Sequence, residues 1–188
     1  MKRLSPHLDE WPVAEELPTI SKLSNQMVCL TGTTDAAQLA FGERLMPSTI
    51  CLSVCHAWTQ RHVEVSGPQL RVLIVDDNSN SAHALAAYLS LENMECRLAY
   101  GGVEAVAVGT DWTPDVIIMD ISMPGCSGFE AAFALRHDPR TCNVVIVAFT
   151  ALDEAEVRKH LADQEFDGYC QKGQAPTNLV GLVTGFTR

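Results

Sequence analysis

The chain has 188 residues and a formal net charge of −10, and hydrophobic residues make up 47% of it. This length fits one domain with an appendage, and the apolar content is enough to build a core. An acidic chain without clustered lysine and arginine lacks the electrostatic signature of nucleic-acid binding. Its longest uncharged stretch is too short to span a bilayer. We therefore expect neither nucleic-acid binding nor membrane insertion.

The first 66 residues give few structural signals. Prolines interrupt any regular pattern there, at Pro6, Pro12, Pro18 and Pro47. The pattern suggests only a short helix over 35–45 and a strand over 48–55, where apolar and polar residues alternate. We expect residues 1–68 to form a poorly structured, mostly flexible N-terminal extension and linker of unknown role. Residues 69–188 are expected to form the folded domain.

Cysteines are spread along the whole chain. The seven are Cys29, Cys51, Cys55, Cys96, Cys126, Cys142 and Cys170. Their odd number, together with the absence of an apolar signal segment after Met1, predicts a reduced, cytoplasmic protein. Cys51, Cys55 and His56 come nearest to a metal-ligand cluster, but a zinc site needs a fourth ligand and usually tighter cysteine pairs. We expect ordinary, partly buried thiols at these positions.

Strand and helix patterns alternate from residue 70 onward. Short apolar runs, typical of buried strands, lie at 72–75, 116–119, 144–149 and 166–170, with a further short strand around Leu98 and Tyr100. Helical patterns lie at 79–92, 103–109, 129–135, 153–163 and 179–186. Repeated βα units predict a parallel sheet with helices on both faces. We expect an α/β fold of the flavodoxin-like, doubly wound type, with a five-stranded parallel sheet in the order 2-1-3-4-5.

The predicted strands deliver polar side chains to one edge of this sheet. Asp76 and Asp77 follow the first strand, and Asp120 follows the third. Thr150 ends the fourth strand, and Lys172 comes just after the fifth. Ligands of open α/β sheets bind beyond the carboxyl ends of the strands. An Asp-Asp pair alone is also typical of a solvated turn, so the interpretation depends on the whole set.

Three carboxylates, a hydroxyl and an ammonium at one edge suit phosphoryl transfer. The carboxylates can hold Mg²⁺, which relieves their mutual repulsion. An aspartate such as Asp120 is also a competent nucleophile toward a phosphoryl group and would give an aspartyl phosphate. The metal and Lys172 would neutralise phosphate charge, and the Thr150 hydroxyl would hydrogen-bond a phosphate oxygen.

The polar set forms part of a wider pattern of residues. Its members are Asp76-Asp77, Asp120 with Met123-Pro124 and Gly128, Thr150-Ala151, Tyr169 and Lys172. With this pattern, residues 70 to about 187 resemble the receiver domain of two-component response regulators, and the spacings fit its single-domain chemotaxis member. Because several residues on four predicted strands take part, the resemblance is far more specific than any single motif.

The resemblance implies a role for each matching residue. Asp120 would be the phosphoacceptor. The Mg²⁺ ligands would be Asp76, Asp77, Asp120 and the main-chain carbonyl of Ser122. Thr150 and Tyr169 would be the switch pair, and Lys172 would contact the phosphate.

One position departs from the family, which commonly has a proline after this lysine with a cis peptide bond. Here Gly173 follows. A cis bond before a non-proline residue costs about 3–4 kcal/mol, so we expect either a trans bond with a rearranged glycine turn or a strained site.

The implied function is a signalling switch rather than an enzyme. A histidine kinase or phosphotransfer protein would donate the phosphoryl group, and an unknown downstream protein would read the result. Because the chain ends one helix after Lys172, we expect no DNA-binding output domain.

Two alternatives stay open. A degenerate receiver would dock partners without phosphorylation, to which Gly173 points. An aspartyl-nucleophile phosphatase is the other, although haloacid-dehalogenase-like enzymes have a second aspartate where this chain has Ser122.

Overall fold

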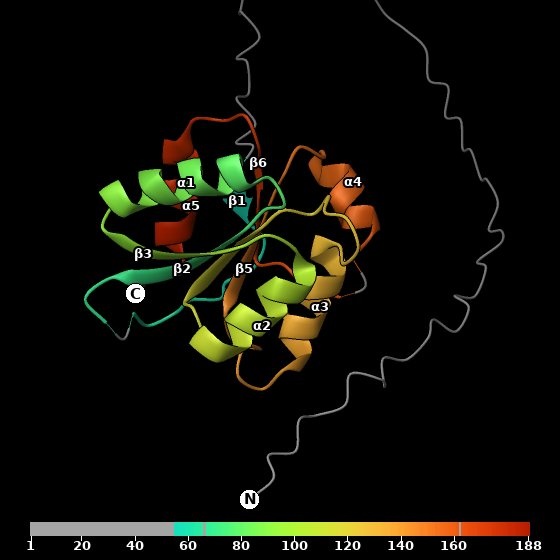
Figure 1. The fold of residues 1–188 in the computed structure, drawn as a ribbon, viewed down its shortest axis with the longest axis horizontal. Helices are drawn as coiled ribbons and strands as arrows, with labels where there is room; N and C mark the ends of the chain where they lie inside the picture. The colour runs from blue at the N-terminus through green and yellow to red at the C-terminus, as the bar shows by residue number, and fades with distance from the viewer. Residues whose placement is uncertain (1–54, 66, 162) are drawn as a thin grey trace, which may run out of the picture. The chain divides into compact units, whose positions relative to one another are not determined.

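The computed structural model describes residues 55–65, 67–161 and 163–188. Within them one sheet has the strand order β1-β6-β5-β4-β2-β3, and helices cover both of its faces (Figure 1). The strands are β1 (Cys55–Ala57), β2 (Leu70–Val75), β3 (Met94–Ala99), β4 (Val116–Met119), β5 (Val145–Thr150) and β6 (Gly168–Gln171). The helices are α1 (Ser79–Leu91), α2 (Gly102–Trp112), α3 (Gly128–His137), α4 (Glu154–Lys159) and α5 (Pro176–Gly185).

Strands β2 to β6 confirm the expected parallel sheet. Without β1 the order is β3-β2-β4-β5-β6, which is 2-1-3-4-5, and every neighbouring pair is parallel. Side chains of the central strands alternate between two cores, as the period of two in a strand requires. Leu73 and Val75 pack toward α2, α3 and α4, whereas Val72 and Ile74 pack toward α1 and α5. Because both faces are covered, β4 is buried along its whole length.

Local capping interactions fix where two helices begin beside the strand ends. The side chain of Asn78 accepts hydrogen bonds from Asn80 N and Ser81 N, and so starts α1 directly after the Asp-Asp pair. Ser127 and Glu130 form a reciprocal capping box at the start of α3. These caps define short, ordered connections after β2 and β4, the strands that carry the predicted carboxylates.

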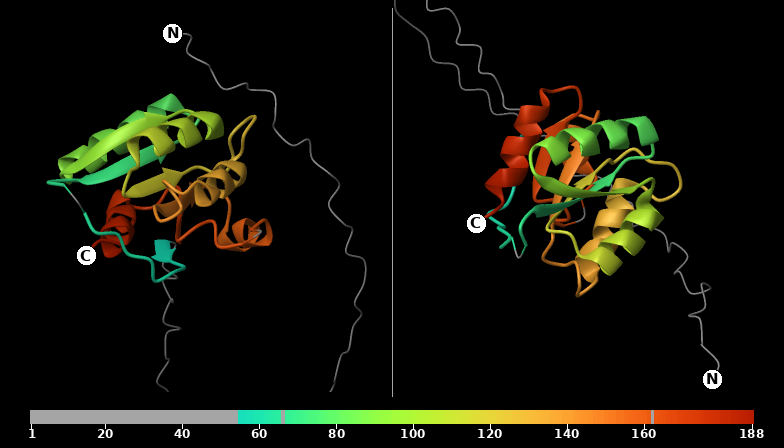
Figure 2. Two further views of the ribbon diagram at one scale, coloured as in Figure 1. Left: turned by 90° about the horizontal axis from the view of Figure 1, so that it is seen from below. Right: turned by 60° about the vertical axis from the view of Figure 1, so that its left-hand side comes forward.

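The residues immediately before the predicted domain belong to the sheet. Strand β1 pairs antiparallel with β6, with Cys55 opposite Cys170 and Ala57 opposite Gly168. Farther along, Val63 N donates to Phe186 O at 2.8 Å, and the segment runs beside α5 (Figure 2). For residues 55–65 the expectation of a flexible linker is therefore corrected. The reason is that β6 offers an open edge, and its unpaired backbone groups are satisfied by this segment.

A disulfide joins Cys55 of β1 to Cys170 of β6. The expectation of an ordinary thiol at Cys55 is therefore wrong, and so is the prediction of reduced cysteines for this pair. Cys96, Cys126 and Cys142 are free cysteines within the described residues. The helix expected over 35–45, the strand expected over 48–55 (apart from Cys55), and Cys29 and Cys51 lie outside the residues that the structure describes.

None of the described helices is both long enough and apolar enough to cross a membrane.

Candidate functional site

Three carboxylates meet where β2 and β4 end. Asp76 and Asp77 directly follow β2, and Asp120 directly follows the neighbouring strand β4. The two strands are in register, and Asp120 N donates to Val75 O at 2.8 Å, which sets the ends side by side. One carboxylate oxygen from each aspartate lies within 4.8 Å of the others. The predicted acidic cluster therefore forms.

Burial and charge suit this cluster to a hard cation. Asp76 and Asp120 are only 3% and 6% exposed, whereas Asp77 faces solvent. Like charges at this separation repel each other, and oxygen ligands of this kind are those that Mg²⁺ prefers. The donor chemistry of the three aspartates thus fits a divalent metal, with Asp77 on the side open to water.

Lys172 joins the cluster from β6. Its Nζ donates to Asp120 Oδ2 at 2.6 Å and to Asp76 Oδ2 at 2.8 Å. Its own main-chain N donates to Thr150 O at 2.8 Å, so the end of β5 fixes where the lysine begins. Burial lowers the pKa of Lys172, but the hydrogen bonds and charges of Asp120 and Asp76 outweigh it and raise the pKa above its ordinary value. The ammonium is held charged against two of the three carboxylates.

Gly173 supplies the turn that the usual proline would occupy. The described residues contain no cis peptide bond, and Gly173 has a φ of 87°. A side chain at this position would meet no atom within 4 Å, so the positive φ, and not space, favours glycine. The expected trans bond with a glycine turn is confirmed, and it leaves Lys172 in contact with Asp120.

The loop after Asp120 is held tightly against β4. Ser122 N donates to Asp120 Oδ1 at 3.2 Å, and Gly128 N donates to Ile121 O at 3.0 Å. A Cβ on Gly128 would lie 2.1 Å from Asp120 O, so only glycine fits there. Ser122 itself is exposed, and the contribution of its carbonyl to a metal stays a prediction.

Thr150 and Tyr169 form a second group that is connected through one residue. Thr150 Oγ1 accepts a hydrogen bond from Leu152 N at 3.3 Å, and the Tyr169 hydroxyl donates to Leu152 O at 2.7 Å. Both side chains are buried. Burial, followed by the charges of Glu154 and Asp153, raises the pKa of the Tyr169 hydroxyl. Leu152 could not be identified from the sequence, because any residue can offer its main-chain groups.

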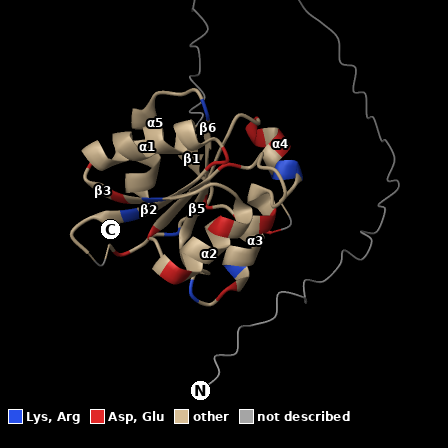
Figure 3. Ribbon diagram, viewed as in Figure 1, with Lys and Arg blue, Asp and Glu red and all other residues tan. Residues whose placement is uncertain are grey.

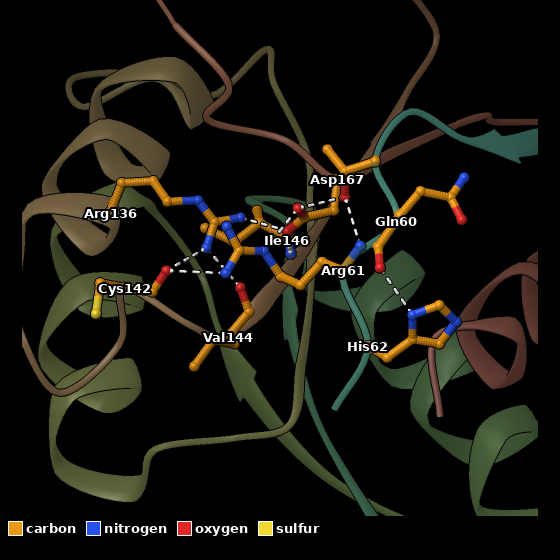
Figure 4. A network of polar contacts seen from close by, with 9 residues as sticks. Gln60, Arg61, His62, Arg136, Cys142, Val144, Ile146 and Asp167 are labelled. Atoms are coloured by element: carbon orange, nitrogen blue, oxygen red, sulfur yellow. Dashed lines mark hydrogen bonds and ion pairs between the residues drawn. The ribbon is translucent and has the colours of Figure 1, made fainter. Parts of the chain in front are cut away.

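Sequence reasoning also missed a buried ionic network at the other end of β6. Asp167, just before this strand, is fully buried and paired with Arg61 and Arg136 (Figure 4). Its carboxylate also accepts a hydrogen bond from Ile146 N at 3.0 Å. No local pattern could have revealed this network, because its members come from distant parts of the chain.

The strand order and the acidic cluster with its lysine define a receiver-type signalling domain. The family model of the response regulator receiver domain matches residues 72–184, and the chain belongs to this family. Receiver domains of two-component systems are phosphorylatable signalling switches, and the similarity to other response regulators supports that function for this domain.

Relatives and solved structures agree with this assignment. The response regulator PleD of Caulobacter vibrioides is 39% identical over 83 residues, which cover 44% of this chain and 18% of the relative. The phosphate regulon transcriptional regulatory protein PhoB of Pseudomonas aeruginosa is 32% identical over 62% of this chain and 51% of the relative. The solved chemotaxis response regulator CheY4 of Vibrio cholerae has a TM-score of 0.58 at 27% identity, covering 62% of this chain and 97% of that chain. The alignments thus span between about a fifth and a half of these curated relatives.

Proposed function

We propose that Asp120 is the phosphoacceptor of this switch and that Mg²⁺ assists its phosphorylation. The observation that carries the proposal is the contact of the Asp120 carboxylate with Lys172 inside a three-carboxylate cluster. The family match covers residues 72–184 and so includes the whole cluster. A receiver would accept the phosphoryl group at this cluster.

The reaction is the transfer of a phosphoryl group from a phosphohistidine donor. An Asp120 oxygen attacks phosphorus, the bond between phosphorus and the donor nitrogen breaks, and the donor imidazole leaves with the electron pair and takes up a proton. Mg²⁺, held by Asp76, Asp77 and Asp120 with the Ser122 carbonyl, would supply positive charge that offsets the charge on the transferred group. Lys172 adds a second positive charge at Asp120 Oδ2.

The response to phosphorylation would pass through Leu152. The Thr150 hydroxyl would turn toward the new phosphate oxygens and so give up its hydrogen bond with Leu152 N. Leu152 O accepts the hydrogen bond from Tyr169, so a shift of this residue changes the environment of the tyrosine. The end of β5, the following loop and Tyr169 therefore form one element that local charge can bias.

The donor would be a histidine kinase or a phosphotransfer protein, and the output a contact with a downstream protein. The acidic character of the chain favours protein partners over nucleic acid. A cytoplasmic location stays a prediction. Docking without phosphorylation is disfavoured by the position of Lys172, since Gly173 leaves the lysine on Asp120.

Incubation with acetyl phosphate, followed by intact-mass analysis, tests the proposal. We expect the chain to gain the mass of one phosphoryl group only when Mg²⁺ is present, and the Asp120→Asn variant to gain nothing. Ser122→Ala is the matched control, because it keeps the main-chain carbonyl and lies two residues away. Absence of the phosphorylated species from the wild-type protein would favour the docking-only alternative, and rapid release of phosphate from small phosphoesters would favour a phosphatase.

A further inference from the structure

Residues 55–65, called the clasp below, are attached to the domain at several separate points. The β1–β6 pairing and the disulfide hold its first residues. Next, Trp58 N and Thr59 N both donate to Asp167 O, at 2.7 and 3.1 Å. Arg61 Nε then donates to the buried Asp167 carboxylate at 2.8 Å (Figure 4). The clasp is thus a fixed part of the surface around β6.

Trp58 lies against the predicted switch tyrosine. The indole and the Tyr169 ring are parallel within 1°, and their centroids are 5.8 Å apart, which is an offset stack. The neighbouring clasp residue His56 stands opposite Tyr169 in the β1–β6 register and meets its ring edge-on, with 6.2 Å between the centroids. Tyr169 is therefore only 2% exposed, and the clasp covers it.

The same indole is tied to α4. Trp58 Nε1 donates to Glu154 Oε1 at 3.0 Å, and the Arg158 guanidinium carbon lies 4.1 Å from the centroid of the indole ring. Glu154 Oε1 also pairs with His56 at 3.1 Å and with Arg158 at 2.7 Å. Helix α4, with its mixed acidic and basic residues, is visible in Figure 3. Trp58 therefore connects β1, β6 and α4 at one point.

Through Tyr169 and Glu154, the clasp contacts two residues that are connected to Leu152. Tyr169 reaches Leu152 O with its hydroxyl, and Glu154 begins α4 two residues after Leu152. A rearrangement of the loop between β5 and α4 that moves the tyrosine would disturb the stack with Trp58 or the hydrogen bond of Trp58 to Glu154. The clasp contacts thus match the present positions of Tyr169 and α4.

We propose that Trp58 is a positioning residue through which the clasp holds Tyr169 and α4 in their unphosphorylated arrangement and thereby opposes phosphorylation of the domain. This inference rests on the proposed function of Asp120 and Tyr169. Coupling between two sites is reciprocal. If phosphorylation lowers the equilibrium constant for clasp attachment by some factor, clasp attachment lowers the equilibrium constant for phosphorylation by the same factor. Weakening the clasp at Trp58 should therefore make the domain easier to phosphorylate.

Fluorine NMR of the 188-residue chain labelled with 5-fluorotryptophan tests the coupling directly. The sequence has three tryptophans, Trp11, Trp58 and Trp112, and a Trp58→Phe variant assigns the signal of Trp58. On addition of acetyl phosphate and Mg²⁺ we expect the Trp58 signal to shift, and the shift to be absent in Asp120→Asn. Trp112, which is packed beneath Arg71 and Arg97, is the internal control and should not move.

The extent of phosphorylation at limiting acetyl phosphate provides the second readout. Trp58→Ala should raise the ratio of phosphorylated to unphosphorylated chain about fivefold or more, a typical size for coupling between sites. Gln60→Ala, at an exposed position of the same clasp, is the matched control and should match wild type. A phosphorylated species whose Trp58 signal is unchanged, with Trp58→Ala equal to wild type, would overturn the coupling and leave the proposed function intact. Failure of every variant to be phosphorylated would instead overturn the proposed function, and the coupling with it.

Discussion

The two ends of strand β6 carry charge clusters of opposite character. After the strand, Lys172 faces Asp76 and Asp120, with Asp77 nearby, so one positive charge stands among three negative ones. Before the strand, Asp167 faces Arg61 and Arg136, so one negative charge stands between two positive ones. The strand between them is four residues long.

The clusters also differ in burial and in how many donors their central carboxylates accept from. Asp167 is wholly buried and accepts from Thr59, Arg61, Arg136 and Ile146. The acidic cluster has an exposed member and an excess of negative charge, which a cation from solvent would balance. Breaking a buried, paired charge network destabilises the fold, whereas an unbalanced, accessible charge is available for chemistry. The following substitutions test that contrast.

The largest effect on stability is expected for Asp167→Ala. It leaves Arg136, whose side chain is 10% exposed, without its carboxylate partner, and it frees Arg61 from the domain. Removing one partner of a buried ion pair costs about 3–5 kcal/mol in the free energy of unfolding. Urea unfolding measures this loss. The surface pair of Asp138 and Arg140 is the control, and Asp138→Ala should change little. Equal, small losses for both variants would contradict a structural role for the buried network.

Loss of the disulfide should come next. Cys55→Ser removes a crosslink between residues separated by 115 positions, and such crosslinks contribute about 2–4 kcal/mol, mainly by restricting the unfolded chain. We expect this loss in urea unfolding under oxidising conditions, and no difference from wild type once a dithiol reductant is present. Cys142→Ser, at a free cysteine, should leave stability unchanged in both conditions. A peptide map without a Cys55–Cys170 link would count against the crosslink.

A methyl group at Gly128 should disturb the Asp120 loop. Its Cβ would meet the backbone oxygen of Asp120, which cannot yield as a flexible side chain would. We expect Gly128→Ala to cost about 1–3 kcal/mol and to slow phosphorylation by acetyl phosphate. Gly101→Ala is the control, since a Cβ there meets nothing within 4 Å and the backbone is extended. Wild-type phosphorylation of Gly128→Ala would show that the loop tolerates displacement.

The smallest stability change should come from the acidic cluster, and its sign should be opposite. Asp77→Asn removes one of three repelling charges, so without metal it should stabilise the protein by up to about 1 kcal/mol. The stabilisation of wild type by added Mg²⁺ should be weaker in this variant, because a ligand has lost its charge. Thermal unfolding with and without Mg²⁺ measures both effects. Destabilisation of the metal-free variant would mean that Asp77 makes a structural interaction.

The parallel sheet and the acidic cluster could be predicted because their signals are local. Four-residue apolar runs identify strands buried on both faces, and parallel connections bring the ends of those strands to one edge. Asp120 and Lys172 therefore came together as expected. The clasp has no such signal. Strand β1 has three residues, its partner Cys170 lies far along the chain, and the odd number of cysteines favoured thiols over a disulfide. Arg61 and Trp58 find their partners only once the domain has folded.

Locating the acyl phosphate in the chain tests the role of Asp120 most directly. The protein is phosphorylated with acetyl phosphate and Mg²⁺, reduced with borohydride, which converts an aspartyl phosphate to homoserine, and sequenced by tandem mass spectrometry. We expect homoserine at position 120, and only when Mg²⁺ was present. Homoserine at Asp76, Asp77 or any other aspartate, or none in a sample that has gained a phosphoryl group, would contradict it.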